Sequence, residues 1–151
     1  MRAITVRQPW AHAVAVGAKT VENRSQNTVY RGEIAIHAAR TVDTPAVHDS
    51  RIMKVFGAAA GLVEPLGAII AVAELVDCHR AAQPGFPADG TCCSPWGNRV
   101  HNERPAFHLM LAHVRRLAEP VSCRGYLHVG WAVPESVAAE VRSQLLTEVT
   151  R

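Results

Sequence analysis

The sequence predicts an α+β domain built on a small β-barrel of about five to seven mixed strands with flanking helices. Strand-like runs joined by connections of different lengths fill most of the chain, and helical patterns occur early and at the C-terminal end. The 151 residues suffice for one domain with a buried core and are too few for two ordinary domains. We therefore expect a single domain over residues 1–151.

Hydrophobic periodicity and turn-forming residues locate the individual elements. Strands are expected at residues 3–6, 20–24, 33–38, 66–78, 106–117 and 125–133. Helices are expected at residues 10–16, 44–59 and 134–149. Pro9 suits the start of the first helix and Gly17 its end, whereas Gly32 suits a turn between two strands. The run at 66–78 is almost continuously apolar, which is typical of a strand buried over most of its length.

Residues 79–105 are rich in proline and glycine and are expected to form a long loop. Loops of this length are more often functional or disordered than simple connections. This segment also mixes tryptophan with basic side chains, as grooves for single-stranded nucleic acid do, so Trp96 and Arg99 are candidate binding residues. An ordered loop whose tryptophan closes one end of the barrel explains the same residues equally well.

The net charge of +3 is a weak argument for a polyanionic partner, but the charges are distributed unevenly. Residues 1–40 carry six basic side chains against two acidic ones, and residues 99–131 carry five arginines against two glutamates. The segment between them is acidic. Fourteen of the sixteen basic residues are arginine, whose planar guanidinium suits phosphate and base stacking. The base composition of the coding sequence explains this bias equally well.

The four cysteines are expected to be reduced thiols of a cytoplasmic protein. The first residues lack the apolar stretch of a signal peptide, and no window reaches the roughly 18 apolar residues of a membrane-spanning helix. Cys92 and Cys93 are adjacent rather than spaced, so we do not expect both to face one ion. The sequence therefore predicts no metal site and no cofactor.

Polar side chains are dense on both sides of the first predicted helix, in the segment RQPWAHAVAVGAKTVENRS. They are Arg7, Gln8 and Trp10 before the apolar run, and Lys19, Glu22 and Arg24 after it. Two residues apart on a strand, Glu22 and Arg24 face the same side. A carboxylate between two cations orients a guanidinium and leaves donors for an anion, so the group predicts a phosphate or base-edge site. Trp10 would offer a stacking face to an unpaired base.

Each of these side chains also has a structural explanation. Trp10 suits the packing of the first helix on the barrel, since large aromatic residues at helical positions usually pack. The charged side chains suit a solvated group of ion pairs, which is common on any surface. Gln8 differs, because a buried amide needs several partners and is more often placed for function or capping than for packing. The residues alone leave these alternatives open.

The same segment, taken with later ones, resembles the ASCH (ASC-1 homology) domain, a branch of the PUA-like superfamily. The resemblance extends from about Ile4 to Trp131. It rests on the Gln8-Pro9-Trp10 triplet, on the spacing of Gly17, Lys19, Glu22 and Arg24, and on the Arg31-Gly32 turn. The resemblance implies a PUA-like β-barrel with flanking helices and a cleft that binds RNA or another nucleic acid.

Some proteins of this family are enzymes that hydrolyse acetylated cytidine or cleave RNA. In those that act on acetylcytidine, a threonine three residues after a lysine is the nucleophile, whereas here Glu22 occupies that position after Lys19. That mechanism is therefore not expected. Another hydrolase would use Glu22 as general base and Lys19 to stabilise negative charge, and a ribonuclease would use His37 or His12 as acid and base.

The leading expectation is a monomeric module that binds RNA, DNA or a nucleotide-like small molecule in one cleft and does not contact a membrane. Its candidate ligand-binding residues are Arg7, Gln8, Trp10, Lys19, Glu22, Arg24 and Arg31, with Trp96 and Arg99 in second rank. The alternatives are a small hydrolase of a modified nucleoside or of RNA, with Lys19 and Glu22 as catalytic residues, and an interaction domain that binds a protein partner through another face.

Overall fold

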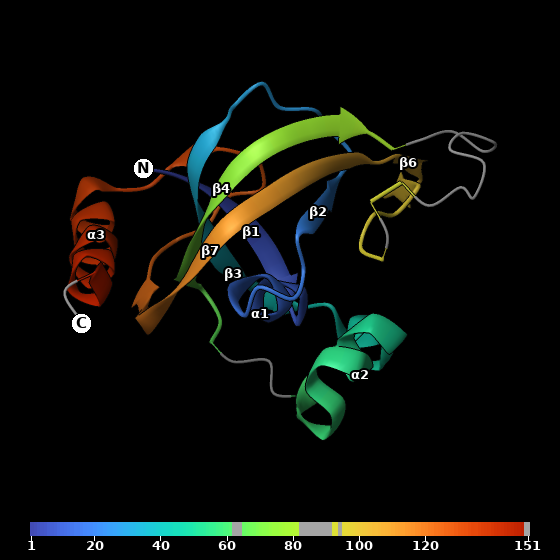
Figure 1. Cartoon of the computed structure of the whole chain (residues 1–151), viewed down its shortest axis with the longest axis horizontal. Coiled ribbons are helices and arrows are strands. Elements are labelled where there is room, and N and C mark those ends of the chain that lie inside the picture. The colour runs from blue at the N-terminus through green and yellow to red at the C-terminus, as the bar shows by residue number, and fades with distance from the viewer. Residues whose placement is uncertain (62–64, 82–91, 94, 150–151) are drawn as a thin grey trace.

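A curved mixed sheet of six strands forms the centre of the protein, whose structure is a computed structural model (Figure 1). The structure describes residues 1–61, 65–81, 92–93 and 95–149. The sheet has the order β2-β7-β4-β3-β1-β8, in which β1 and β3 are parallel and all other neighbours antiparallel. Its strands are β1 (Arg2–Gln8), β2 (Val21–Arg24), β3 (Gly32–Val42), β4 (Ala68–Arg80), β7 (Phe107–Ser122) and β8 (Trp131–Ala132).

In the described part of the chain three α-helices accompany the sheet, so the predicted mixed α+β class is confirmed. They are α1 (Trp10–Ala15), α2 (Ser50–Phe56) and α3 (Glu135–Val149). Two 3₁₀ segments, η1 (Thr44–His48) and η2 (Gly57–Gly61), flank α2, and β5 (Val100–His101) pairs with β6 (Arg104–Pro105) in a separate small hairpin. None of the described helices is both long and apolar enough to cross a membrane.

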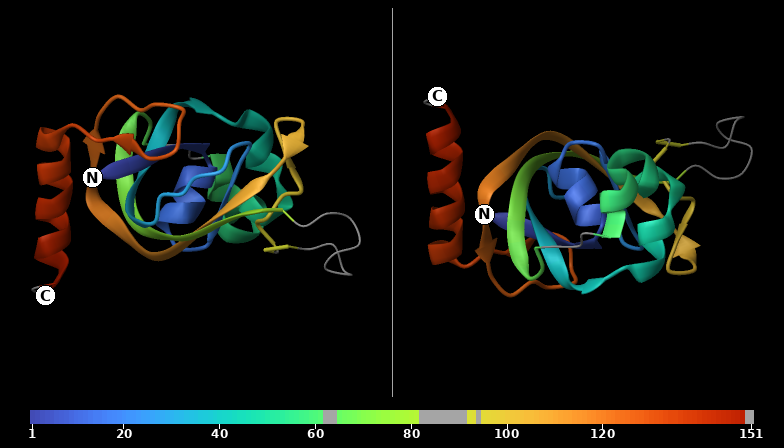
Figure 2. Two further views of the ribbon diagram at one scale, coloured as in Figure 1. Left: turned by 90° about the horizontal axis from the view of Figure 1, so that it is seen from above. Right: turned by 90° about the horizontal axis from the view of Figure 1, so that it is seen from below.

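The two faces of the sheet pack against different helices. Ile4 and Ile34 belong to a buried cluster that includes Val14 of α1, whereas the neighbouring Ala3 and Ala35 belong to a second cluster that includes Val141 of α3. Successive side chains of a strand point to opposite faces, so a strand that is apolar at consecutive positions contributes side chains to both clusters. Figure 2 shows the result: α1 lies within the curve of the strands and α3 lies outside it.

Strands β4 and β7 are neighbours in the sheet and curve together along their length (Figure 1). Their pairing contains three register shifts, and such irregularities bend and twist a strand pair locally. This curvature brings β1 and β2 near each other although they are not neighbours in the sheet. Among the described residues the end strands β2 and β8 form no ladder with each other, so the predicted small barrel is not confirmed.

The predicted helix at 44–59 is wrong in extent, because the segment forms η1, α2 and η2 instead. Asp49 has extended backbone angles (φ −64°, ψ 131°), and its side chain accepts a hydrogen bond from the main-chain nitrogen of Arg51. Asp49 therefore caps α2 and separates it from η1. Gly57, with φ of 53°, ends α2 at its other end.

The predicted strand at 125–133 is mostly irregular, and only Trp131–Ala132 pairs with β1. Gly125 lies so close to the ring of His37 that a side chain there would clash, and Gly130 has φ of 74°, so the chain turns before it can enter the sheet. The predicted loop at 79–105 is shorter than expected, because β4 extends to Arg80 and the β5–β6 hairpin forms within it. Its residues 82–91 and 94 lie outside the described residues.

Candidate functional site

A cleft of about 390 Å³ lies between β1 and β2, two strands that the sheet order separates. The end of β1 and the start of α1 line one part of it, and Lys19 and β2 line another. The remaining lining residues are Ala39, Thr41, Asp43, Arg51, Asn98, His101, Asn102 and Leu127. Its ionisable lining side chains are Arg7, Lys19, Glu22, Arg24, Asp43, Arg51 and His101. The cleft therefore combines side chains from most of the N-terminal half of the chain with a segment that follows β4.

A buried group of charges occupies the β2 side of the cleft. The Nζ atom of Lys19 lies 2.8 Å from Oε2 of Glu22, and Nε of Arg24 lies 3.2 Å from Oε1 of the same carboxylate. The ammonium also donates to the main-chain oxygen of Val21, and the Arg24 guanidinium donates to that of Thr5 in β1. Because Lys19 is 3% exposed and Glu22 is 8% exposed, the alternative of a solvated surface ion pair is wrong for these two residues.

The charges of this group set the protonation of its members. Burial raises the pKa of Glu22, but the positive charges of Lys19 and Arg24 and the hydrogen bond from Lys19 hold it below its ordinary value. Burial lowers the pKa of Lys19, and Glu22 opposes that shift. Glu22 is therefore a carboxylate at neutral pH, which accepts a hydrogen bond from Lys19 and forms an ion pair with Arg24.

Trp10 and Arg51 form the opposite side of the cleft, and a second tryptophan packs behind them. The indole nitrogen of Trp10 donates to Oδ2 of Asp43 over 2.9 Å. The guanidinium carbon of Arg51 lies 5.2 Å from the ring centroid of Trp10 and 5.6 Å from that of Trp96, within cation–π range. The two indole rings pack edge to face at 6.4 Å. Trp96 is buried and does not line the cleft, so it supports Trp10, which does.

Residues 4–98 match the family model of the ASCH domain. The chain belongs to the ASCH domain family. Crystal structures of the ASCH protein of Zymomonas mobilis are similar to this chain. One point-mutant form is 14% identical, with a TM-score of 0.58, and the match covers 94% of this chain and 96% of the Zymomonas chain. A second structure, of the protein without a named mutation, is 13% identical, with a TM-score of 0.57, and the match covers 94% of this chain and 93% of the Zymomonas chain.

At this identity the likeness to the Zymomonas protein shows the fold alone. No curated protein matches the sequence of this chain. The resemblance to the ASCH family that the N-terminal motifs predict is thus confirmed by the family match and by the fold.

The structure brings together part of the site predicted for this ASCH domain. The predicted residues that line the cleft are Arg7, Trp10, Lys19, Glu22 and Arg24. The others do not line it. Gln8 is fully buried: its Oε1 accepts from the main-chain nitrogen of His12 and its Nε2 donates to Pro65 O, so its amide holds α1 in place. Arg31 pairs with Asp77 outside the cleft, and Arg99 is exposed elsewhere.

The histidines named for a ribonuclease mechanism also lie outside the cleft. His12 packs against Phe56, and His37 is buried against Trp131 with its Nε2 3.1 Å from the Cys123 carbonyl oxygen. His101 lines the cleft instead. Burial and the nearby positive charges lower the pKa of His101 although Glu22 opposes them, so its imidazole is neutral at neutral pH.

Among the residues that line the ASCH cleft, sequence reasoning missed Arg51. This arginine binds Asp49 through two hydrogen bonds of 2.8 and 2.9 Å and also donates to Oδ1 of Asn98. In the sequence Arg51 reads as one polar position of a predicted helix. No local pattern indicates that it reaches a residue 47 positions away.

Sequence reasoning also missed a cluster of sulfur and nitrogen atoms. The side chains of His79, Cys92, Cys93 and His108 bring one Sγ or ring nitrogen each to within 4.8 Å of one another. The expectation that adjacent cysteines cannot face one point is wrong. It holds for a strand, where neighbours point apart, but Cys93 has φ of 60° in a turn.

We expect Glu22→Gln to lower the free energy of unfolding by about 3 kcal/mol at pH 7, because it leaves the Lys19 ammonium buried without its counter-charge. The pKa of Glu22 is lowered by folding, so its contribution is present above an unfolded pKa of about 4.3 and is lost as the pH falls through the folded value. Urea unfolding from pH 7 to pH 3 should therefore show a shallower acid decline in the variant.

The matched control is Glu135→Gln, which removes an exposed ion pair with Arg142 and should change the free energy of unfolding by no more than about 1 kcal/mol. Equal stability losses in the two variants would contradict a special contribution from the buried carboxylate.

Proposed function

We propose that this ASCH domain binds single-stranded nucleic acid, RNA foremost, in the cleft between β1 and β2. The observation that carries the proposal is a cleft lined by several cations beside a partly exposed indole, the pairing that grips phosphates and stacks bases. The ASCH family is generally thought to bind RNA, which supports the same ligand class.

The charges of the cleft favour an anionic ligand. Its cations are Arg7, Lys19, Arg24 and Arg51, and its carboxylates are Glu22 and Asp43. Both carboxylates are engaged, Glu22 by two cations and Asp43 by the indole nitrogen of Trp10. Arg7 is exposed at the rim and has no carboxylate partner among the described residues, so its guanidinium is available to a phosphate.

The roles of the lining residues follow from their surroundings. Arg7 and the remaining donors of Arg24 contact phosphate, while Lys19 and Glu22 hold Arg24 in position. Trp10 stacks on a base, and the contacts of Arg51 and Trp96 with the indole fix its position. Asn102 is exposed at the cleft and offers an amide to a base edge.

A hydrolase is the second candidate, because a buried lysine–glutamate pair and a neutral histidine line the same cleft. In that reaction His101 or Glu22 would accept a proton from the attacking group, and Lys19 would stabilise developing negative charge. Both carboxylate oxygens of Glu22 are occupied by cations, which lowers its basicity and favours the binding role.

We expect Arg7→Ala to weaken binding of a single-stranded RNA about 5- to 10-fold at low salt and to reduce the slope of log affinity against log salt by about 0.7, the value of one lost phosphate contact. Fluorescence anisotropy over a salt series measures both. The control is Arg142→Ala on α3, outside the cleft, and an equal loss in this variant would refute the cleft as the site.

We expect bound RNA to quench tryptophan fluorescence through Trp10, because Trp96 is 6% and Trp131 is 1% exposed and neither can stack on a base. Trp10→Phe should remove most of the quenching, whereas the matched Trp131→Phe should retain it. Quenching that survives in Trp10→Phe would place the bases elsewhere.

Incubation with labelled RNA and with acylated nucleosides distinguishes the two candidates. We expect RNA to be bound and both substrates to be recovered unchanged, as measured by gel electrophoresis and chromatography. Turnover that Glu22→Gln abolishes while RNA binding persists would instead assign the cleft to hydrolysis.

A further inference from the structure

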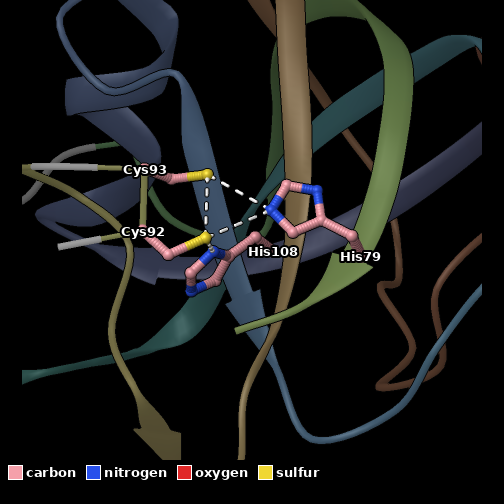
Figure 3. A group of neighbouring side chains, drawn as sticks. All are labelled: His79, Cys92, Cys93 and His108. Atoms are coloured by element: carbon pink, nitrogen blue, oxygen red, sulfur yellow. Dashed lines mark hydrogen bonds between the residues drawn. The ribbon is translucent and has the colours of Figure 1, made fainter. Parts of the chain in front are cut away.

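Four side chains converge at the end of the β4–β7 pair, away from the lining of the cleft (Figure 3). The Sγ atoms of Cys92 and Cys93 lie 3.7 Å apart. Nε2 of His79 lies 3.5 Å from the first sulfur and 3.3 Å from the second, and Nδ1 of His108 lies 3.5 Å from Cys92 Sγ. Two thiols and two imidazoles thus aim their potential ligand atoms at one point.

The fold brings these side chains together from distant positions. His79 and His108 are directly paired across β4 and β7, so the sheet register puts both imidazoles on one face. The cysteines approach from a turn closed by a 2.8 Å hydrogen bond from Gly97 N to Cys93 O. A side chain at Gly97 would collide with the Cys92 carbonyl and the His108 ring, so glycine permits the turn to lie this close.

The separations match the edges of a metal tetrahedron. Zn–S bonds of about 2.3 Å and Zn–N bonds of about 2.0–2.1 Å give edges of about 3.8 Å between two sulfurs and about 3.5 Å between sulfur and nitrogen. The measured edges of 3.7, 3.5, 3.5 and 3.3 Å agree with these values. The two remaining edges, which both end at His108, are at most 4.8 Å.

Both imidazoles also have the outer partners of metal-ligating histidines. Nε2 of His108 lies 2.8 Å from the main-chain oxygen of Asn98, so it donates its hydrogen there and leaves Nδ1 bare. Nδ1 of His79 lies 2.7 Å from Oδ2 of Asp77, which leaves Nε2 bare. In each ring the nitrogen without the hydrogen is the one that faces the sulfurs.

The geometry points to a tetrahedral Zn²⁺ site formed by His79, Cys92, Cys93 and His108. Two thiolates and two imidazoles are a ligand set that favours zinc, and four protein ligands leave no open position, which is the mark of a structural site. The ion would join the turn that carries the cysteines to the β4–β7 pair. This inference does not depend on RNA binding.

Cobalt substitution tests the site directly. The full chain is reduced, stripped with a chelator and titrated with Co²⁺. We expect one equivalent to produce the intense visible bands of tetrahedral cobalt and the near-ultraviolet thiolate-to-cobalt band, and Zn²⁺ to displace both. Cys92→Ser and Cys93→Ser should each weaken cobalt binding by at least 10-fold. The matched controls Cys78→Ser and Cys123→Ser should bind as the unaltered chain does.

The histidine orientation has its own test. Asp77→Asn leaves all four ligands in place but weakens the acceptor of the His79 hydrogen, so we expect metal affinity to fall about 10-fold while the tetrahedral spectrum is retained. An unchanged affinity would remove Asp77 from the site as a positioning residue.

Thiol alkylation of the unaltered chain gives a measurement that no folding defect can obscure. Zn²⁺ should slow the reaction of Cys92 and Cys93 with iodoacetamide at least 10-fold and leave Cys123 unaffected, as mapped by mass spectrometry. Absence of tetrahedral bands at stoichiometric Co²⁺, unchanged bands in the cysteine variants, or a Cys92–Cys93 disulfide formed in place of metal binding under reducing conditions would each overturn the proposal.

Discussion

The buried contact between Lys19 and Glu22 fixes the geometry on which the cleft depends. Removing two charges from water costs several kcal/mol for each, and only close contacts that satisfy the remaining donors and acceptors offset that cost. Here Glu22 receives a cation at each oxygen, and Lys19 also donates to a main-chain carbonyl. Arg24 extends the group to Thr5 in β1. Side chains, not a strand ladder, thus connect β2 to β1 across the cleft, and the cleft remains accessible between them.

Arg51 has the corresponding role on the opposite side. It is held by Asp49, lies against both tryptophan rings and reaches Asn98 in the segment after β4. A planar guanidinium with five donors can make these contacts at once, whereas an ammonium could not. Asp49, at the break between η1 and α2, therefore has two roles: it caps the helix and it orients the Arg51 side chain.

The sequence predicted what depends on local pattern. The periodicity located most of β1, β3, β4, β7 and α3, and the motifs of the N-terminal segment indicated the ASCH family and the charged side of the cleft. The sequence did not predict the positions of side chains that long-range contacts determine. Gln8 belongs to the motif, yet its amide forms hydrogen bonds with main-chain atoms. Arg51 forms a hydrogen bond with a residue 47 positions away. The prediction that Cys92 and Cys93 do not face one point is wrong, because the positive φ of Cys93 cannot be predicted from the neighbouring residues.

Asn98 connects the cleft with the sulfur and nitrogen cluster. Its side chain accepts from Arg51, its main-chain oxygen accepts from His108, and its main-chain nitrogen donates to Oδ1 of Asn23 in β2. An ion that holds His108 would therefore restrict the residue that positions Arg51. If the ion strengthens ligand binding in the cleft by some factor, the ligand must strengthen metal binding by the same factor, since coupling between two sites is reciprocal. Asn98 would then support both sites.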